Sequence, residues 1–156
     1  MSDKRGVLFV CLGNICRSPI AEAVFQKLLD QRGLNDRWFC DSAATADYHT
    51  GEMPDHRAIK VLQENGIETK HRARRIKKDD FQRFEFIFGM DTNNIDSMKR
   101  FAPKGTESKI QLLGDYHPDG AQIIEDPYYL GGIDGFYANY DQCKKCCEAF
   151  LDKMSK

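Results

Sequence analysis

Two cysteines and an arginine lie close together near the start of the chain. Cys11 and Arg17 are separated by five residues, and Cys16 directly precedes the arginine. A thiolate is a strong nucleophile, and a guanidinium can hold two oxygens of one tetrahedral anion through parallel hydrogen bonds. This residue set therefore indicates attack by Cys11 on a phosphate ester that Arg17 holds.

The segments on either side of this stretch would position it. The preceding apolar residues 7–10 predict a strand that is buried on both faces. Ser18 and Pro19 predict a helix start, with the serine as its cap and the proline at its first position. The Gly13-Asn14 pair tolerates left-handed backbone, so the loop can turn its amides toward an anion at the helix N-terminus.

Other interpretations of this stretch have less support. A cysteine at a strand end is often only a small buried residue. Cys11 and Cys16 could bind a metal, but no second Cys or His pair lies at ligand spacing nearby. The glycine patterns of nucleotide-binding loops are absent. A phosphate-binding loop explains the residues best.

Residues 11–18, Cys-Leu-Gly-Asn-Ile-Cys-Arg-Ser, resemble the active-site loop of the low-molecular-weight protein tyrosine phosphatases. The run Asp126-Pro127-Tyr128-Tyr129 is similar to the general-acid loop of the same family. Further residues between these motifs follow the family's order and approximate spacing: Ser42, Tyr48, Pro54, Asp55, His71, Ala73, Arg74, Asp79, Phe81, Met90 and Asp91. The resemblance covers nearly the whole chain.

Strand and helix patterns alternate along the chain, which predicts a parallel sheet covered on both faces. Strands are expected at 7–10, 38–44, 85–88 and 109–113, and helices at 19–32, 56–64, 79–81, 92–100 and 135–154. Residues 114–132 are expected to form a long functional loop. The resemblance implies a three-layer α/β/α fold with a four-stranded, flavodoxin-like sheet in the order 2-1-3-4, and an active site at the carboxyl end of the first strand.

The expected reaction is hydrolysis of a phosphate monoester in two steps. Cys11 attacks phosphorus to give a phosphocysteine, while Arg17 and the loop amides stabilise the charge of the transition state. Asp126 protonates the leaving oxygen and then activates water. The phosphate-binding loop is expected to comprise Leu12, Gly13, Asn14, Ile15, Cys16 and Ser18.

The resemblance also implies roles for residues around this loop. Tyr48 and Tyr128 would wall a slot for an aromatic ring, whereas the neighbouring His49 is expected to be exposed. Ser18 would donate a hydrogen bond to the Cys11 thiolate, and Asn14 would hold the loop in shape. Supporting roles are implied for Ser42, His71, Asp91 and Tyr129. From its position alone, Asp91 could equally be a simple helix cap.

The whole chain limits the class of protein. Its 156 residues fit a single domain over 1–156, and the net charge of −1 gives no reason to expect a nucleic-acid partner. We expect no targeting segment, no membrane span, no cofactor and no metal, and a monomer in the cytoplasm. The expected substrates are phosphotyrosine proteins or small aryl and acyl phosphate esters, with inorganic phosphate as the product.

Three rival functions share parts of this pattern. Arsenate reductase on the same fold needs relay cysteines in mid-chain, but none occurs between Cys40 and Cys143. A phosphocysteine carrier would need neither Arg17 nor Asp126, and an inactive phosphotyrosine-binding protein would not keep the whole set. Core packing explains the cysteines of the last helix better than a metal site does. The basic run 71–78 is expected to be a solvated face rather than a targeting signal.

Cys16 suggests a further property of the loop, because the proposed hydrolysis does not use it. A loop that curls around one small anion can bring Cys11 and Cys16 within disulfide reach. Oxidation of a reactive thiolate gives a sulfenic acid that condenses with a neighbouring thiol. We therefore expect a reversible disulfide between these two residues, unless the Cys16 side chain faces away.

Overall fold

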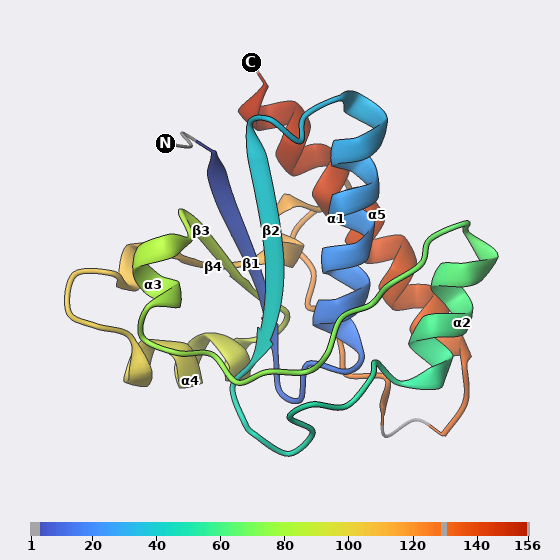
Figure 1. Cartoon of the computed structure of the whole chain (residues 1–156), viewed down its shortest axis with the longest axis horizontal. Helices are drawn as coiled ribbons and strands as arrows, with labels where there is room; N and C mark the ends of the chain where they lie inside the picture. The colour runs from blue at the N-terminus through green and yellow to red at the C-terminus, as the bar shows by residue number, and fades with distance from the viewer. Residues whose placement is uncertain (1–3, 129–130, 156) are drawn as a thin grey trace.

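A four-stranded parallel sheet forms the centre of the protein in the computed structural model, which describes residues 4–128 and 131–155 (Figure 1). The strands are β1 (Arg5–Cys11), β2 (Trp38–Ala44), β3 (Phe86–Gly89) and β4 (Ile110–Leu112). They lie in the order β2-β1-β3-β4, and every neighbouring pair is parallel. The predicted strand order 2-1-3-4 is confirmed.

Helices cover both faces of this sheet (Figure 1). One face carries α1 (Arg17–Arg32) and α5 (Asp134–Met154), which pack against each other, with α2 (His56–Glu64) beside them. The other face carries α3 (Asp80–Arg83) and α4 (Thr92–Phe101), and the short 3-10 helices η1 (Glu107–Lys109) and η2 (Leu113–Tyr116) flank β4. Within the described part of the chain, no helix is long and apolar enough to cross a membrane.

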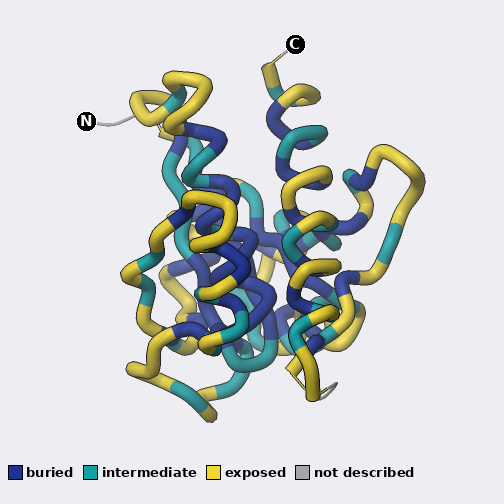
Figure 2. Tube along the Cα trace, turned by 90° about the vertical axis from the view of Figure 1, so that its right-hand side faces the viewer, coloured by how far each residue is buried: buried dark blue, intermediate teal, exposed yellow. Residues whose placement is uncertain are grey.

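Strand β1 contributes to two separate clusters of buried side chains, one on each face of the sheet. Val7 and Phe9 belong to the cluster that also contains residues of α1 and α5, whereas Leu8 and Val10 pack with residues of α3 and α4. All four are completely buried, and the trace through the middle of the molecule is correspondingly dark in Figure 2. Because side chains alternate along a strand, this burial on both faces is what the apolar run predicted.

The start of α1 differs from the prediction that Ser18 caps the helix. The helix begins at Arg17, and its N-cap residue Cys16 makes no side-chain capping bond. The Ser18 hydroxyl instead lies 3.0 Å from the Cys11 sulfur and accepts a hydrogen bond from Asn14 Nδ2 at 2.8 Å. The prediction was wrong because this hydroxyl bonds to the Cys11 sulfur and the Asn14 side chain instead of to a backbone amide of the helix.

The long segment after β4 folds back toward the carboxyl ends of the strands. A Cβ atom at Gly114 would lie 1.7 Å from the carbonyl oxygen of Gln122, so this close approach requires glycine. Beyond it, the Ile124 amide donates to the Met90 carbonyl at 3.0 Å. These contacts carry the following residues, including Asp126, to the edge of the sheet where β1 ends.

Candidate active site

A small pocket lies at the carboxyl end of β1, over the loop that joins this strand to α1. Its volume is about 30 Å³. The residues that line it are Cys11, Leu12, Gly13, Ile15, Cys16, Arg17, Tyr48, His49, Asp126 and Tyr128. The structure therefore brings together the three residues that the sequence suggested for catalysis, although they come from distant parts of the chain.

The side chain of Asn14 fixes the shape of the loop from behind. Its backbone has a positive φ of 59°, the only such value among the described residues other than glycine. Its Nδ2 atom donates to the hydroxyls of Ser18 at 2.8 Å and Ser42 at 2.9 Å. Its Oδ1 atom accepts the Arg74 backbone amide at 3.0 Å and lies 2.6 Å from His71 Nε2. Such a fully bonded buried amide holds the loop in one conformation.

The carbonyl groups of the loop are used by segments outside it. The Cys11 carbonyl accepts a hydrogen bond from the Thr45 backbone amide at 3.0 Å, and the Leu12 carbonyl accepts one from the Ala46 amide at 3.1 Å. The Ile15 carbonyl accepts one from the Asp55 amide at 2.7 Å. These three carbonyls are therefore paired with donors from outside the loop. The backbone amide of Asn14 donates toward the pocket side, to the Cys11 sulfur at 3.3 Å.

Arg17 is a buried charge, with a side chain only 2% exposed. Its Nη1 atom donates to Asp91 Oδ2 at 2.6 Å and to the Ile124 carbonyl at 3.0 Å. Its Nη2 atom lies 3.6 Å from Asp126 Oδ2, and its Nε atom is buried without a hydrogen-bond partner. One side of the guanidinium is thus anchored, while Nε makes no hydrogen bond with the described residues.

The charge state of Arg17 follows from its surroundings. Burial by itself lowers the pKa of the guanidinium, but nearby Cys11 and the hydrogen bond to Asp91 outweigh this effect and raise it. The side chain therefore carries its positive charge throughout the range in which an enzyme works. A permanent positive charge next to a thiol stabilises the thiolate form.

Asp91 fulfils both of the roles that the sequence left open. Its Oδ1 atom accepts the backbone amide of Asn94 at 2.8 Å, and Asn94 Oδ1 accepts the Asp91 amide at 3.2 Å, which forms a capping box at the start of α4. Its Oδ2 atom binds Arg17. A helix cap therefore also positions the arginine of the loop.

Asp126 lies on a segment that two helices hold in place. Its Oδ1 atom accepts the Tyr128 amide at 3.0 Å, and its side chain is 24% exposed, so the carboxyl group contacts both protein and solvent. Arg57 of α2 donates to the carbonyls of Tyr128 at 3.4 Å and Gly132 at 3.2 Å. Asn139 of α5 donates to the Glu125 carbonyl at 3.1 Å.

Arg57 is a residue of the site that the sequence pattern did not predict. Its guanidinium forms an ion pair with Asp55, and it lies 5.8 Å from the centre of the Tyr128 ring. The one available signal was an arginine two residues after the Asp55 that caps α2, a spacing that favours a local ion pair. Nothing in that spacing indicated contact with a segment more than seventy residues away.

Aromatic side chains surround the mouth of the pocket. Tyr48 is 68% exposed and Tyr128 is 38% exposed, and both line the pocket. His49, which was expected to be simply exposed, also lines it: its ring lies 6.0 Å from the Tyr128 ring. A Cβ atom at Gly13 would lie 2.9 Å from the His49 ring, so glycine lets this ring cover the loop. Tyr129 lies outside the described residues.

Behind the loop, Ser42 and His71 connect it to two acidic residues. Ser42 Oγ donates to Glu22 Oε1 and lies 3.2 Å from His71 Nε2. His71 Nδ1 lies 3.1 Å from Glu22 Oε1. Burial raises the pKa of Glu22 to about 7 and lowers the pKa of His71. Both side chains are therefore pushed toward their neutral forms.

Four of the remaining cysteines are buried, and Cys40 is half-buried. Burial and the nearby Cys11 raise the pKa of Cys16, so this residue remains a neutral thiol. Cys143, Cys146 and Cys147 of α5 are all at most 1% exposed and belong to the cluster between α5 and the sheet. The prediction that these three residues serve core packing is confirmed.

The fold and the pocket define an α/β protein in which a Cys-x5-Arg loop lines a pocket together with the acidic residue Asp126. A family model described as low molecular weight phosphotyrosine protein phosphatase matches residues 6–156. The protein of this description from Sus scrofa is 50% identical over 152 residues, which cover 96% of each chain. The chain belongs to the low molecular weight phosphotyrosine protein phosphatase family, a family of hydrolase enzymes.

Two solved structures show the same similarity in three dimensions. A protein tyrosine phosphatase from Entamoeba histolytica, with Hepes in its active site, has a TM-score of 0.93 at 37% identity and covers 97% of both chains. A Drosophila arginine phosphatase has a TM-score of 0.90 at 40% identity, covering 96% of this chain and 98% of its own. The family resemblance and the fold predicted from the sequence are confirmed.

The double role of Asp91 can be separated by two substitutions. We expect Asp91→Asn and Asp91→Ala both to lower kcat/KM for p-nitrophenyl phosphate by about tenfold or more, because both remove the negative charge that pairs with the guanidinium of Arg17. Only Asp91→Ala also removes the cap of α4, at about 1 kcal/mol of unfolding free energy, whereas Asn caps as well as Asp. Urea unfolding measures the second effect. Unchanged kinetics in Asp91→Asn would show that Arg17 does not need this charge.

Proposed function

We propose that this protein hydrolyses phosphotyrosine in proteins, and small aryl and acyl phosphate esters, with residues 1–156 acting as one catalytic domain. The observation that carries the proposal is the buried, unpartnered Nε atom of Arg17, a residue that lines one pocket together with Cys11 and Asp126. A buried donor without an acceptor indicates a ligand that supplies one. The descriptions of the family and of its similar members support phosphotyrosine as that ligand.

In the first step, the Cys11 thiolate attacks phosphorus and a sulfur–phosphorus bond forms. Arg17 holds two phosphate oxygens through Nε and Nη2, and the amides of the loop hold the remaining charge, since three of its carbonyls are already paired with other segments. The bond between phosphorus and the phenolic oxygen breaks. Asp126 gives its proton to that oxygen, so that tyrosine leaves as a neutral phenol.

In the second step, the phosphocysteine is hydrolysed. The Asp126 carboxylate takes a proton from water, and the water oxygen attacks phosphorus as the sulfur–phosphorus bond breaks. Inorganic phosphate and the Cys11 thiolate result, and Asp126 is again protonated. The Ser18 hydroxyl, 3.0 Å from the sulfur, donates to the departing thiolate. No metal takes part in either step.

The aromatic rim supports a flat, aromatic leaving group. Tyr48, His49 and Tyr128 line the pocket around a loop that is itself covered by the His49 ring. Aromatic faces bind another ring over a large apolar area and orient it. A tyrosine side chain placed between them would bring its phosphate to Cys11, whereas the shorter phosphoserine would not reach as far.

The protein is further proposed to be a monomer that acts in the cytoplasm, and the state of its cysteines supports this location. All six cysteines are free thiols, and five of them are buried. Chains with many free thiols are typical of reducing compartments. We propose the cytoplasm as the place of action on this ground.

Turnover with and without a metal chelator tests the proposed function. We expect wild-type protein to hydrolyse p-nitrophenyl phosphate and phosphotyrosine peptides at the same rates with and without EDTA. The Cys11→Ser variant should lose this activity while it still binds phosphate. The serine hydroxyl is too weakly acidic to form the nucleophilic anion. Circular dichroism of the variant confirms folding. Retained turnover by Cys11→Ser would exclude Cys11 as the nucleophile.

The same assay separates the rival reactions. Arsenate reduction, measured with a thiol reductant, would identify an arsenate reductase, for which the chain offers no cysteine between Cys40 and Cys143. Because one similar structure is an arginine phosphatase, phosphoarginine is included among the substrates. Preference for phosphoarginine or arsenate over phosphotyrosine would contradict the proposal.

The role of Asp126 depends on the leaving group. We expect Asp126→Ala to slow hydrolysis of phosphotyrosine by about 10²–10⁴-fold, because the basic phenolate needs a proton from the enzyme. Hydrolysis of p-nitrophenyl phosphate should fall much less in the first step, since its leaving group is stable as an anion. Burst kinetics separate this step from breakdown of the phosphocysteine. Equal losses of the first-step rate for both esters would assign the acid to another residue.

The expected disulfide between Cys11 and Cys16 can be tested by oxidation. Both thiols line the same pocket, at 3% and 4% exposure. Peroxide converts the Cys11 thiolate to a sulfenic acid; the Cys16 thiol then displaces water and forms the disulfide. We expect dithiothreitol to restore the wild-type activity but not that of Cys16→Ser, whose Cys11 oxidises further. Full recovery of Cys16→Ser would show that Cys16 does not protect the nucleophile.

A further inference from the structure

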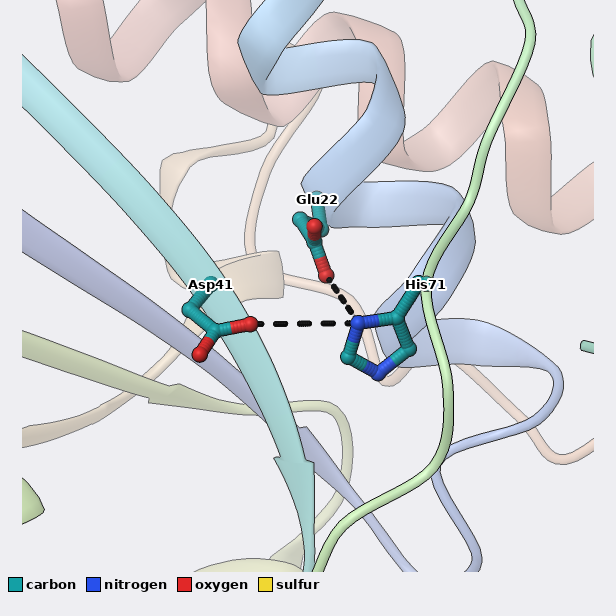
Figure 3. Close-up of side chains that lie close together, drawn as sticks. All are labelled: Glu22, Asp41 and His71. Carbon is teal, nitrogen blue, oxygen red and sulfur yellow. Dashed lines mark ion pairs between the residues drawn. The ribbon is translucent and has the colours of Figure 1, made fainter. Parts of the chain in front are cut away.

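Three side chains from separate segments converge behind the phosphate-binding loop, as Figure 3 shows. Glu22 comes from α1, Asp41 from β2, and His71 from the extended segment between α2 and α3. His71 Nδ1 lies 3.1 Å from Glu22 Oε1 and 3.8 Å from Asp41 Oδ1. One atom of each residue lies within 4.8 Å of the others. Two carboxylates thus approach a single ring nitrogen.

Hydrogen bonds outside this group determine which nitrogen of His71 carries a proton. Asn14 Oδ1 accepts the backbone amide of Arg74 at 3.0 Å, which identifies this atom as the oxygen of the side-chain amide. His71 Nε2 lies 2.6 Å from the same oxygen and must therefore donate to it. In a neutral imidazole this leaves Nδ1 with a lone pair that faces Glu22 and Asp41.

A lone pair and a carboxylate oxygen repel each other at 3.1 Å unless a cation lies between them. That cation is either a proton or a metal ion. We propose that Glu22, Asp41 and His71 form a binding site for a divalent transition metal of the zinc class. Ligand atoms about 2.1 Å from a tetrahedral zinc ion lie roughly 3.4 Å apart. The two distances from Nδ1, 3.1 and 3.8 Å, lie on either side of this value.

The surroundings of the three ligands meet the other requirements of a metal site. His71 donates its second ring nitrogen to an amide oxygen, the arrangement that orients metal-bound histidines. Asp41 is held through its other oxygen by Arg74 at 3.1 Å, and Ser42 donates to Glu22. Imidazole with two carboxylates suits zinc, cobalt or manganese, whereas magnesium and calcium prefer oxygen ligands alone.

An ion can reach the site from solvent. A hollow of about 880 Å³ is lined by both Glu22 and His71. Gln26, Glu68 and Thr69 contribute polar groups to its wall. The hollow provides an entry path, and it leaves room for water to complete the coordination shell.

The proposed metal takes no part in the hydrolysis, because it lies on the opposite side of Asn14 from Cys11. Its effect is on the loop: bound to Nδ1, it holds the His71 ring in the orientation that donates to Asn14. Asn14 in turn bonds Ser18, which contacts the nucleophile. Occupation of the site is therefore expected to stabilise the folded protein.

Titration with Co²⁺ tests the site, since cobalt reports its ligands through absorption. In the full-length Cys11→Ser protein, which removes the reactive thiol, we expect a visible d–d band at one equivalent. No thiolate-to-cobalt charge-transfer band should accompany it. Zn²⁺ should displace the cobalt and raise the melting temperature, whereas Mg²⁺ should do neither. A charge-transfer band would place the metal on cysteine, and no saturable binding would show that only a proton lies between His71 and Glu22.

Matched variants locate the bound ion. Asp41→Asn should weaken Co²⁺ binding by about tenfold or more, because it replaces a carboxylate ligand by a neutral amide. Glu68→Gln removes a charge from the wall of the same hollow but no proposed ligand, and should bind Co²⁺ as the parent does. If Asp41→Asn does not fold, Glu22→Gln takes its place. Equal affinity in the ligand variant and in Glu68→Gln would overturn the proposal.

Discussion

The candidate active site depends on the burial of one positive charge. A guanidinium removed from water carries a large desolvation penalty unless charges and hydrogen bonds replace the lost solvent. Arg17 obtains them from Asp91 at the start of α4, from the Ile124 carbonyl, and from the more distant Asp126. These partners come from separate parts of the chain. The arginine can therefore be buried only when α4 and the segment 117–128 have folded against the loop.

The loop needs a second constraint, because its shape is unfavourable for the backbone. Asn14 adopts a left-handed conformation, which L-residues other than glycine rarely populate. The hydrogen bonds of its side chain to Ser18, Ser42, His71 and the Arg74 amide compensate for this strain. The loop is thereby ordered before any substrate binds. Donors that are already oriented need no rearrangement as charge develops during a reaction.

The parts of the structure that follow from local pattern were predictable from the sequence. The apolar run 7–10 and the helical spacing after it gave the central strand and α1, and with the family resemblance they gave the sheet order. Ser18 was assigned as a cap because local pattern cannot show a competing tertiary partner. His49 and Arg57 were missed for the same reason: each becomes informative only through a contact distant in the chain.

The two sides of the loop impose different physical demands. The pocket side keeps a donor of Arg17 unpaired, and such a group persists only because the rest of the guanidinium is firmly held. The opposite side has more acceptors than donors, because Glu22 and Asp41 both face one nitrogen of His71. Asn14 lies between the two sides and bonds to Ser18 on the pocket side and to His71 on the other. A cation between His71 and the two acidic residues would therefore change the charge near the loop without changing the hydrogen bonds that shape the loop. The reason is that His71 donates to Asn14 through Nε2, whether its Nδ1 binds a proton or a metal ion.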